Sequence, residues 1–192
     1  MSFARMRLVL VAASLALGLA VPAGAKVVDG VNFPDTVDVA GVPLARNGIG
    51  ARTVVFMRFY LAALYVEKAG ADAAALLAPD RPRQVRLAML KEVTQQRFQD
   101  AAREGFEKNT PSPSASLLER EARFLALVPG LVPGDTLTFT YEPGVGTRIA
   151  GNKVKTTVIP GKDFADALWG IWMGPHPVDG DLKKGLLGKD SL

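Results

Sequence analysis

The fold is decided by Gly48-Ile49-Gly50-Ala51-Arg52-Thr53-Val54-Val55-Phe56-Met57-Arg58-Phe59-Tyr60-Leu61-Ala62-Ala63-Leu64-Tyr65-Val66. β-branched and aromatic residues dominate this run, which favours strands over helices. The pattern predicts buried strands over Thr53–Tyr60 and Leu61–Glu67, or one long bent strand. The glycine-rich segment Asn47–Ala51 before them is predicted as a turn.

A cation, Arg52, stands at the head of this apolar run. Burying a guanidinium without a partner is very costly, so the side chain must reach water or an anion. One interpretation is a structural salt bridge at a strand end. The other is an acidic ligand, bound by Arg52 together with the hydroxyl of Tyr60 or Tyr65. The residues alone leave both interpretations open.

Further strands and helices are predicted on both sides of this run. Alternation or hairpin signals predict strands over Val37–Val39, Val42–Leu44, Val85–Met89, Thr136–Tyr141, Arg148–Ala150 and Lys153–Ile159. Caps and helical spacing predict helices over Ala73–Ala78 (cap Asp72), Thr94–Lys108, Leu117–Leu127 (capping box Ser116 and Glu119), Phe164–Met173 (cap Asp163) and Asp181–Leu187. Consecutive hairpins predict an antiparallel sheet, and helices on one of its faces would leave a cleft between the layers.

The first residues have the layout of a secretory signal peptide. Arg5 and Arg7 precede the apolar run Leu8–Leu19, and Ala23-Gly24-Ala25 matches a small-residue cleavage site. The apolar run is too short to span a bilayer. We expect residues 1–25 to be removed and residues 26–192 to form one domain, exported to the periplasm or secreted, without a stable membrane anchor.

Composition excludes several classes of function. The net charge of +4 falls by two when Arg5 and Arg7 are lost, and no basic stripe with interleaved aromatics remains, so no nucleic-acid partner is expected. The chain has no cysteine, which excludes a thiol nucleophile, and its single histidine excludes a histidine-rich metal site. Gly48-Ile49-Gly50 leads into a strand and lacks a third glycine, so it is not a dinucleotide fingerprint. No metal or cofactor is expected, apart from haem with His176 as an axial ligand, a minor alternative.

Four stretches in order resemble the chalcone isomerase-like superfamily, especially its short exported bacterial branch. They are the Gly48–Val66 run, Val28-Asp29-Gly30-Val31-Asn32-Phe33-Pro34, Arg97–Phe106, and Trp169–Gly174 with Asp181–Gly188. The resemblance covers nearly all of residues 26–192. It implies an α+β, open-faced β-sandwich, in which a large antiparallel sheet is covered on one face by helices, with a cleft between.

The resemblance also implies site residues. In the plant isomerases a cleft arginine assists ring closure of a chalcone, helped by a threonine, a tyrosine, an asparagine and a serine or threonine. Arg52 matches that arginine. Tyr60, Phe98, Gly105 and Ile171 stand near the other positions. Phe98 and Gly105 donate no side-chain hydrogen bond to a developing oxyanion, so much of the catalytic stabilisation is missing.

An arginine with a tyrosine is instead similar to the fatty-acid-binding relatives, in which both grip a carboxylate. The resemblance therefore favours a non-catalytic protein that binds a small apolar acid through Arg52, Tyr60, Tyr65, Phe98, Ile171 and Trp172. The first alternative is an intramolecular lyase or isomerase acting on a chalcone-like enone or phenolic ligand, with Arg52 catalytic. The second is haem binding, as in some fungal members. The sequence assigns no oligomeric state.

Overall fold

The structure is a computed structural model that describes residues 24–189. The predicted signal peptide lies almost entirely outside these described residues. Among residues 24–189, no helix combines the length and the apolar character needed to cross a bilayer.

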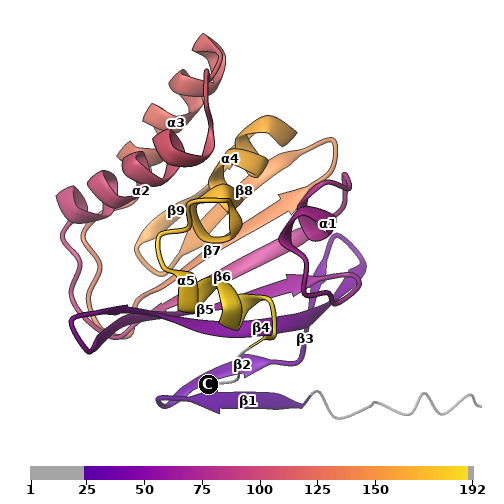
Figure 1. Cartoon of the computed structure of the whole chain (residues 1–192), viewed down its shortest axis with the longest axis vertical. Coiled ribbons are helices and arrows are strands. Elements are labelled where there is room, and N and C mark those ends of the chain that lie inside the picture. The colour runs from indigo at the N-terminus through magenta and orange to yellow at the C-terminus, as the bar shows by residue number, and fades with distance from the viewer. Residues whose placement is uncertain (1–23, 190–192) are drawn as a thin grey trace, which may run out of the picture.

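Seven antiparallel strands form one sheet in chain order, β3-β4-β5-β6-β7-β8-β9. Each strand pairs with the next through a hairpin or a longer connection, so the topology is a meander (Figure 1). A separate two-stranded hairpin, β1 and β2, precedes it. The strands are β1 (Ala25–Val28), β2 (Val31–Pro34), β3 (Thr36–Val39), β4 (Val42–Val54), β5 (Met57–Val66), β6 (Arg83–Met89), β7 (Thr136–Glu142), β8 (Gly146–Gly151) and β9 (Val154–Ile159).

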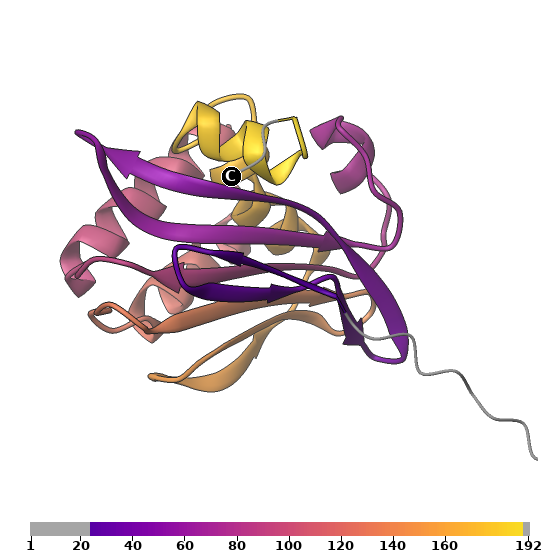
Figure 2. The same cartoon turned by 90° about the horizontal axis from the view of Figure 1, so that it is seen from below.

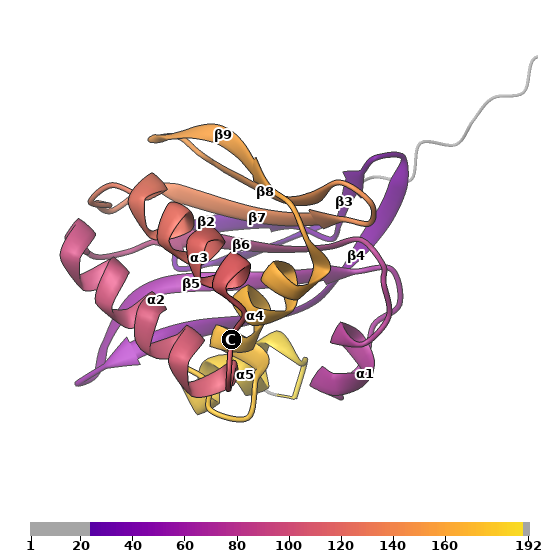
Figure 3. The ribbon, with the colours of Figure 1, turned by 90° about the horizontal axis from the view of Figure 1, so that it is seen from above.

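The helices lie on one face of this sheet (Figures 1 and 3). They are α1 (Ala73–Leu77), α2 (Gln95–Asn109), α3 (Ala115–Leu127), α4 (Lys162–Met173) and α5 (Gly180–Leu186). Helix α4 packs directly between the sheet and the α2–α3 pair, and nine of its residues are buried. The predicted α+β architecture, with a large antiparallel sheet covered on one face by helices, is confirmed.

Strand β5 is buried on both faces from Leu61 to Val66. Tyr60, Ala62 and Leu64 pack toward the helices. Leu61 and Tyr65 pack on the opposite face, in a second apolar cluster that includes Phe33 of β2. Successive side chains of a strand point to opposite faces. An uninterrupted apolar run is therefore what a strand with two covered faces requires.

Helix α5 touches strand β4 backbone to backbone, and glycines make this approach possible. A Cβ atom at Gly48 would stand 2.1 Å from the carbonyl oxygen of Gly185, and one at Gly50 would stand 2.4 Å from that of Leu182. Any side chain at these positions would force the helix away from the sheet. The prediction of a turn over Asn47–Ala51 is wrong: the segment is strand, and its glycines serve packing.

Helix ends follow the predicted caps, with two corrections. Asp72 and Thr94 cap α1 and α2 as expected. Helix α3 is capped by Ser114, whose side chain accepts from the amide of Leu117, and not by Ser116. Asp163 lies inside the first turn of α4 rather than at its cap. Its carboxylate instead pairs with Arg120, and this pair binds α4 to α3.

The Gly48–Val66 run is a hairpin whose turn the sequence did not reveal. The predicted division at Tyr60 and Leu61 is wrong, because β4 ends at Val54 and β5 begins at Met57. The two turn residues, Val55 and Phe56, have φ values of 46° and 65°. Two-residue hairpin turns require positive φ, which Asn and Gly adopt readily and β-branched or bulky residues do not.

Replacing the turn by Val55→Asn with Phe56→Gly is expected to raise the free energy of unfolding by about 1–2 kcal/mol, because left-handed backbone is strained for valine and phenylalanine. Urea unfolding followed by circular dichroism measures the change. Val145→Thr in the β7–β8 turn is the control: Val145 is about half exposed, and we expect a change within about 0.5 kcal/mol. A less stable double variant would contradict the strain argument.

Candidate functional site

An apolar slot lies between the sheet and the helical layer. Its volume is about 80 Å³. The walls come from β5, β6, α2, α3, α4, the connection between β6 and α2, and the segment before α5. They comprise Tyr60, Leu87, Met89, Val93, Arg97, Phe98, Ala101, Ala102, Phe124, Ile171, Trp172 and Val178. No carboxylate is among these lining residues. The slot is the cleft that the sequence predicted between the two layers.

The polar end of the slot is a hydrogen-bonded pair. The indole Nε1 of Trp172 donates to the hydroxyl oxygen of Tyr60 at 3.2 Å. Because the hydroxyl oxygen accepts this bond, its own proton stays available to donate. Burial raises the pKa of Tyr60 to about 12, although the hydrogen bond from Trp172 and the charge of Arg52 oppose the shift. The group is therefore a donor near neutral pH and not a base.

Arg52 lies beside the slot and is ion-paired. It is the register partner of Tyr60 across β4 and β5. Its Nη1 lies 3.1 Å from Oδ2 of Asp179, the residue that follows the slot-lining Val178. The side chain of Arg52 is 28% exposed. Within residues 24–189 the protein partners of Arg52 are all at Nη1, so Nε and Nη2 face no protein acceptor.

Asp179 holds four donors at once. Its Oδ1 accepts the amides of Asp181 and Leu182, which caps α5, and its Oδ2 accepts the amide of Thr53 as well as Arg52. Burial by itself would raise the pKa of Asp179, but the amides of Leu182 and Thr53 and the Arg52 guanidinium lower it on balance. The carboxylate stays ionised and joins α5 to the end of β4.

Four predicted site residues, Tyr60, Phe98, Ile171 and Trp172, line the slot. The placement of Tyr65 with them is wrong. Five residues along β5 from Tyr60, Tyr65 points to the opposite face and is fully buried there. An odd spacing in a strand separates two side chains by the whole sheet. Arg52 forms the salt bridge of the first interpretation, with Asp179 as its partner, whereas the acidic ligand of the second interpretation stays a prediction.

Sequence reasoning missed Asp179, Arg97 and Val178. Asp179 directly precedes a helix, and aspartate is a preferred N-cap residue. The first turn of that helix is acidic and its last turn is basic, which also supports a cap at Asp179. Nothing in the sequence pairs it with Arg52, because 127 positions separate the two. Arg97 belongs to the Arg97–Phe106 stretch that resembles the family, and the structure places it in the slot lining.

Helix α2 approaches α4 at Gly105. A Cβ atom at Gly105 would stand 2.9 Å from both Cγ atoms of Ile171. Since Ile171 lines the slot, this contact sets how closely α2 approaches α4 beside the slot. Gly105 therefore has a packing role here.

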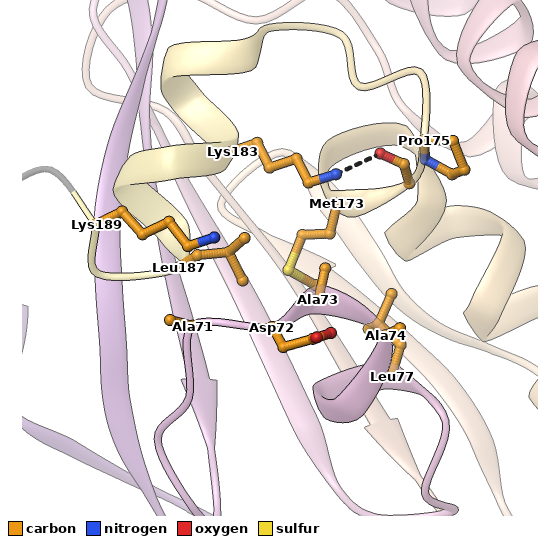
Figure 4. A pocket seen from close by; sticks show the side chains of 11 residues that line it. Ala71, Asp72, Ala73, Ala74, Leu77, Met173, Pro175, Lys183, Leu187 and Lys189 are labelled. Carbon is orange, nitrogen blue, oxygen red and sulfur yellow. Dashed lines mark hydrogen bonds between the residues drawn. The ribbon is translucent and has the colours of Figure 1, made fainter.

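A larger hollow of about 450 Å³ lies at the other end of β5, between α1 and α5 (Figure 4). Apolar side chains such as Met173, Leu77 and Leu187 form its floor. The ammonium of Lys183 lies beside it and donates to the carbonyl oxygen of Gly174 at 2.8 Å. The hollow is wide open and the Lys183 ammonium already has an acceptor. It lacks the buried, convergent polar groups of the slot.

The slot has hydrogen-bond donors, Tyr60 and Trp172, and a cation, Arg97, but no side chain suited to act as a general base. Its only titratable lining residues are Tyr60 and Arg97. His176 lies outside it, exposed on the α4–α5 loop, where its backbone is held by the side chain of Asn109. A haem in the slot would thus receive no ligand from His176, and the residues present do not fit this group. Among the described residues, no cluster of three or more metal-ligating side chains occurs.

The sequence profile of the chalcone isomerase-like family matches residues 25–188. This chain belongs to the chalcone isomerase-like family. No curated protein matches the chain by sequence. Among solved structures, it is similar to a fatty-acid binding protein of Arabidopsis thaliana, with a TM-score of 0.65 and 15% identity over 85% of this chain and 96% of the plant protein. At that identity the likeness shows the chalcone isomerase fold alone.

The pairing of Asp179 predicts a pH-dependent loss of stability. A folded-state pKa below the ordinary value of about 3.9 stabilises the protein above that pH, and this contribution disappears as the pH falls through the folded pKa. Asp179→Ala is expected to cost about 1–2 kcal/mol at pH 7, from the lost cap and ion pair, and less at pH 3.

Urea unfolding of both proteins at pH 7 and pH 3 measures this difference. Asp181→Ala is the matched control, since its carboxylate is 86% exposed in the same turn and pairs only with Lys184 among the interactions described. We expect its cost to stay below about 0.5 kcal/mol. An Asp179→Ala penalty that is equal at both pH values would contradict the assignment.

The Gly105 contact predicts a steric penalty. Gly105→Ala gains about 1 kcal/mol of helix propensity but is opposed by about 1–3 kcal/mol of overpacking against Ile171. We expect a net loss of stability of up to about 2 kcal/mol. In an Ile171→Ala background the same change should cost less or stabilise, and a double-mutant cycle measures the coupling. Additive effects would show that the two side chains do not compete for space.

Proposed function

We propose that this protein is exported and, without catalysing a reaction, binds a small apolar carboxylate such as a fatty acid in the slot between sheet and helices. The observation that carries the proposal is the Tyr60 hydroxyl. Its oxygen accepts the indole N–H of Trp172, its pKa of about 12 keeps it protonated at neutral pH, and Arg52 is its register partner on β4. A carboxylate at the slot entrance supplies the acceptor that this arrangement lacks.

The guanidinium of Arg52 retains donors for such a ligand. Only Nη1 contacts Asp179, so Nε and Nη2 offer a second edge of the planar fork. Asp179 depends little on Arg52 for its own hydrogen bonds, because three backbone amides also reach it. The ligand carboxylate would therefore share Arg52 with Asp179, without leaving either carboxylate unsatisfied.

The walls suit a hydrocarbon tail. Leu87, Met89, Phe98 and Ile171 present only apolar atoms to the slot. Its volume is below the roughly 300–1,000 Å³ of pockets that enclose drug-sized ligands. A medium or long tail would thus enter only as the half-buried Phe98 and helix α2 move away from the sheet. Phe98 contacts Phe124 of α3 at a ring-centroid distance of 6.0 Å, so α3 would respond to the same motion.

Binding is preferred over isomerisation because Phe98 and Ile171 line the slot with side chains that donate no hydrogen bond to a reacting oxyanion. Catalysis of acyl- or enone-type chemistry depends on such preorganised donors. By the family resemblance, Phe98, Gly105 and Ile171 stand near the positions of hydrogen-bonding residues in the plant enzymes, and their side chains donate no hydrogen bond. The pKa of Tyr60 near 12 is unsuited to a general base at neutral pH. The fatty-acid binding protein of similar fold supports the same choice of ligand class.

Export rests on the basic start, the apolar run Leu8–Leu19 and the Ala23-Gly24-Ala25 site. The first strand begins at Ala25, so cleavage after Ala25 would leave nearly all of the described fold. Mass spectrometry of the protein recovered from the periplasm and from the medium gives the first residue. A chain that starts at Met1 and stays in the cytoplasm would overturn this part of the proposal.

The ligand proposal is tested by calorimetric titration of delipidated protein with dodecanoate and with its methyl ester. Arg52→Ala is expected to weaken dodecanoate binding about 10- to 100-fold, as loss of a charged hydrogen bond predicts. Tyr60→Phe should weaken it about 2- to 10-fold. The ester should bind the wild-type protein no better than the acid binds Arg52→Ala.

Arg148→Ala is the matched control, because Arg148 is an ion-paired strand arginine that lies outside the slot. Its affinity for dodecanoate should equal that of the wild type. Equal binding of acid and ester would contradict the carboxylate site. Loss of chalcone absorbance that depends on Arg52 would favour the isomerase alternative instead.

A further inference from the structure

The tip of the β4–β5 hairpin exposes an apolar surface. Four consecutive residues form it: Val54, Val55, Phe56 and Met57 are 38%, 78%, 99% and 51% exposed. None of them packs against either apolar core. A single exposed valine is ordinary on a protein surface, but four successive apolar side chains around a fully exposed phenylalanine are not.

The backbone of the tip is strained to hold these side chains outward. Both turn residues have positive φ, at 46° for Val55 and 65° for Phe56. Other tight turns in this chain place glycine beside the strained position, as Asp29-Gly30 and Ala40-Gly41 do. Neither Val55 nor Phe56 has its side chain in an apolar core, so no core packing offsets the strain. Strain that folding does not explain points to a function for the side chains themselves.

The tip also projects from the molecule and is bordered by cations. Figures 2 and 3 show the β4–β5 hairpin extending past the neighbouring strands at the end of the sheet where α2 begins. Arg52 precedes and Arg58 follows the tip, and the strand pair Val42–Val66 contains no acidic residue. The side chain of Arg58 is 43% exposed, and its ion pair with Asp29, the one found among residues 24–189, uses only Nη1.

We propose that the hairpin tip docks the protein on a lipid surface. An apolar, convex loop flanked by arginines matches the membrane–water interface, where aromatic and aliphatic side chains enter the acyl boundary while cations stay with the phosphates. A protein partner or a second copy would call for a flat or complementary area, whereas this surface is a narrow projection of four residues. Docking of this kind is peripheral and requires no spanning helix.

The position of the tip gives docking a consequence for the slot. Tyr60 lies on β5, four residues after Phe56 of the turn, and pairs with Met89, which also lines the slot. A bilayer that received the tip would therefore face the same end of the sheet as Tyr60 and Arg52. The inference goes beyond the proposed function and does not depend on it, because docking requires only the tip and its flanking cations.

The absence of cysteine makes a direct test available. Val55→Cys and, as the matched control, Val145→Cys are labelled in the full chain with an environment-sensitive nitrobenzoxadiazole dye. Val145 is 49% exposed in the β7–β8 turn, at the opposite end of the sheet. With vesicles of phosphatidylcholine and phosphatidylglycerol at a 7:3 ratio, we expect emission to rise at least twofold at position 55 and to stay unchanged at position 145.

A second variant separates docking from folding. Val55→Asn with Phe56→Gly suits the turn backbone, so it should fold at least as well as the wild type, yet lower the fraction that co-sediments with the same vesicles at least fivefold. It should leave dodecanoate affinity in vesicle-free buffer unchanged, whereas Tyr60→Phe lowers that affinity and leaves the emission rise at position 55 unchanged. The proposal is overturned if the dye responds equally at both positions or at neither. It is also overturned if the wild-type protein does not bind the vesicles but self-associates in a concentration-dependent way, and the double variant abolishes that self-association.

Discussion

The rest of the site depends on the direct contact between α5 and β4. Gly48 and Gly50 leave the strand without side chains where the carbonyls of Gly185 and Leu182 arrive. Such contact leaves no room for adjustment, since protein interiors are packed as densely as crystals. The contact fixes where α5 begins, and with it the position of its cap. A helix one side chain farther out would separate the cap from the sheet.

Because α5 is held against β4, its N-cap residue Asp179 lies close enough to β4 to form an ion pair with Arg52. Its carboxylate joins the first amides of α5 to Thr53 and Arg52 at the end of β4. This ion pair holds Arg52 beside Tyr60, its register partner on β5. The Tyr60 hydroxyl in turn accepts a hydrogen bond from the indole of Trp172 on α4. Three separate parts of the chain thus meet at one edge of the slot. The result is a cluster of donors beside an apolar wall, suited to an anion with a hydrocarbon tail.

The two ends of β5 differ in the use they make of apolar residues. Toward Val66 they are buried on both faces and give the sheet its stability. Toward Met57 the apolar residues lie outside both cores and form the exposed tip, where they make no core contact that would stabilise the fold. Slot and tip share this end of the sheet, which is why a lipid surface and an apolar ligand are compatible proposals for the same molecule.

The sequence by itself determined most of the helices and strands, the α+β class and the family resemblance, since these follow from local periodicity, caps and ordered motifs. It also singled out Arg52 and four of the slot residues. It missed the turn at Val55 and Phe56, because no Gly, Asn, Asp or Pro marks it. It also misplaced Tyr65, because an apolar run covered on both faces carries no alternation to show which way each side chain points. Only the tertiary structure decided that Asp179 meets Arg52, because a contact between residues 127 positions apart is set by how helix and sheet pack.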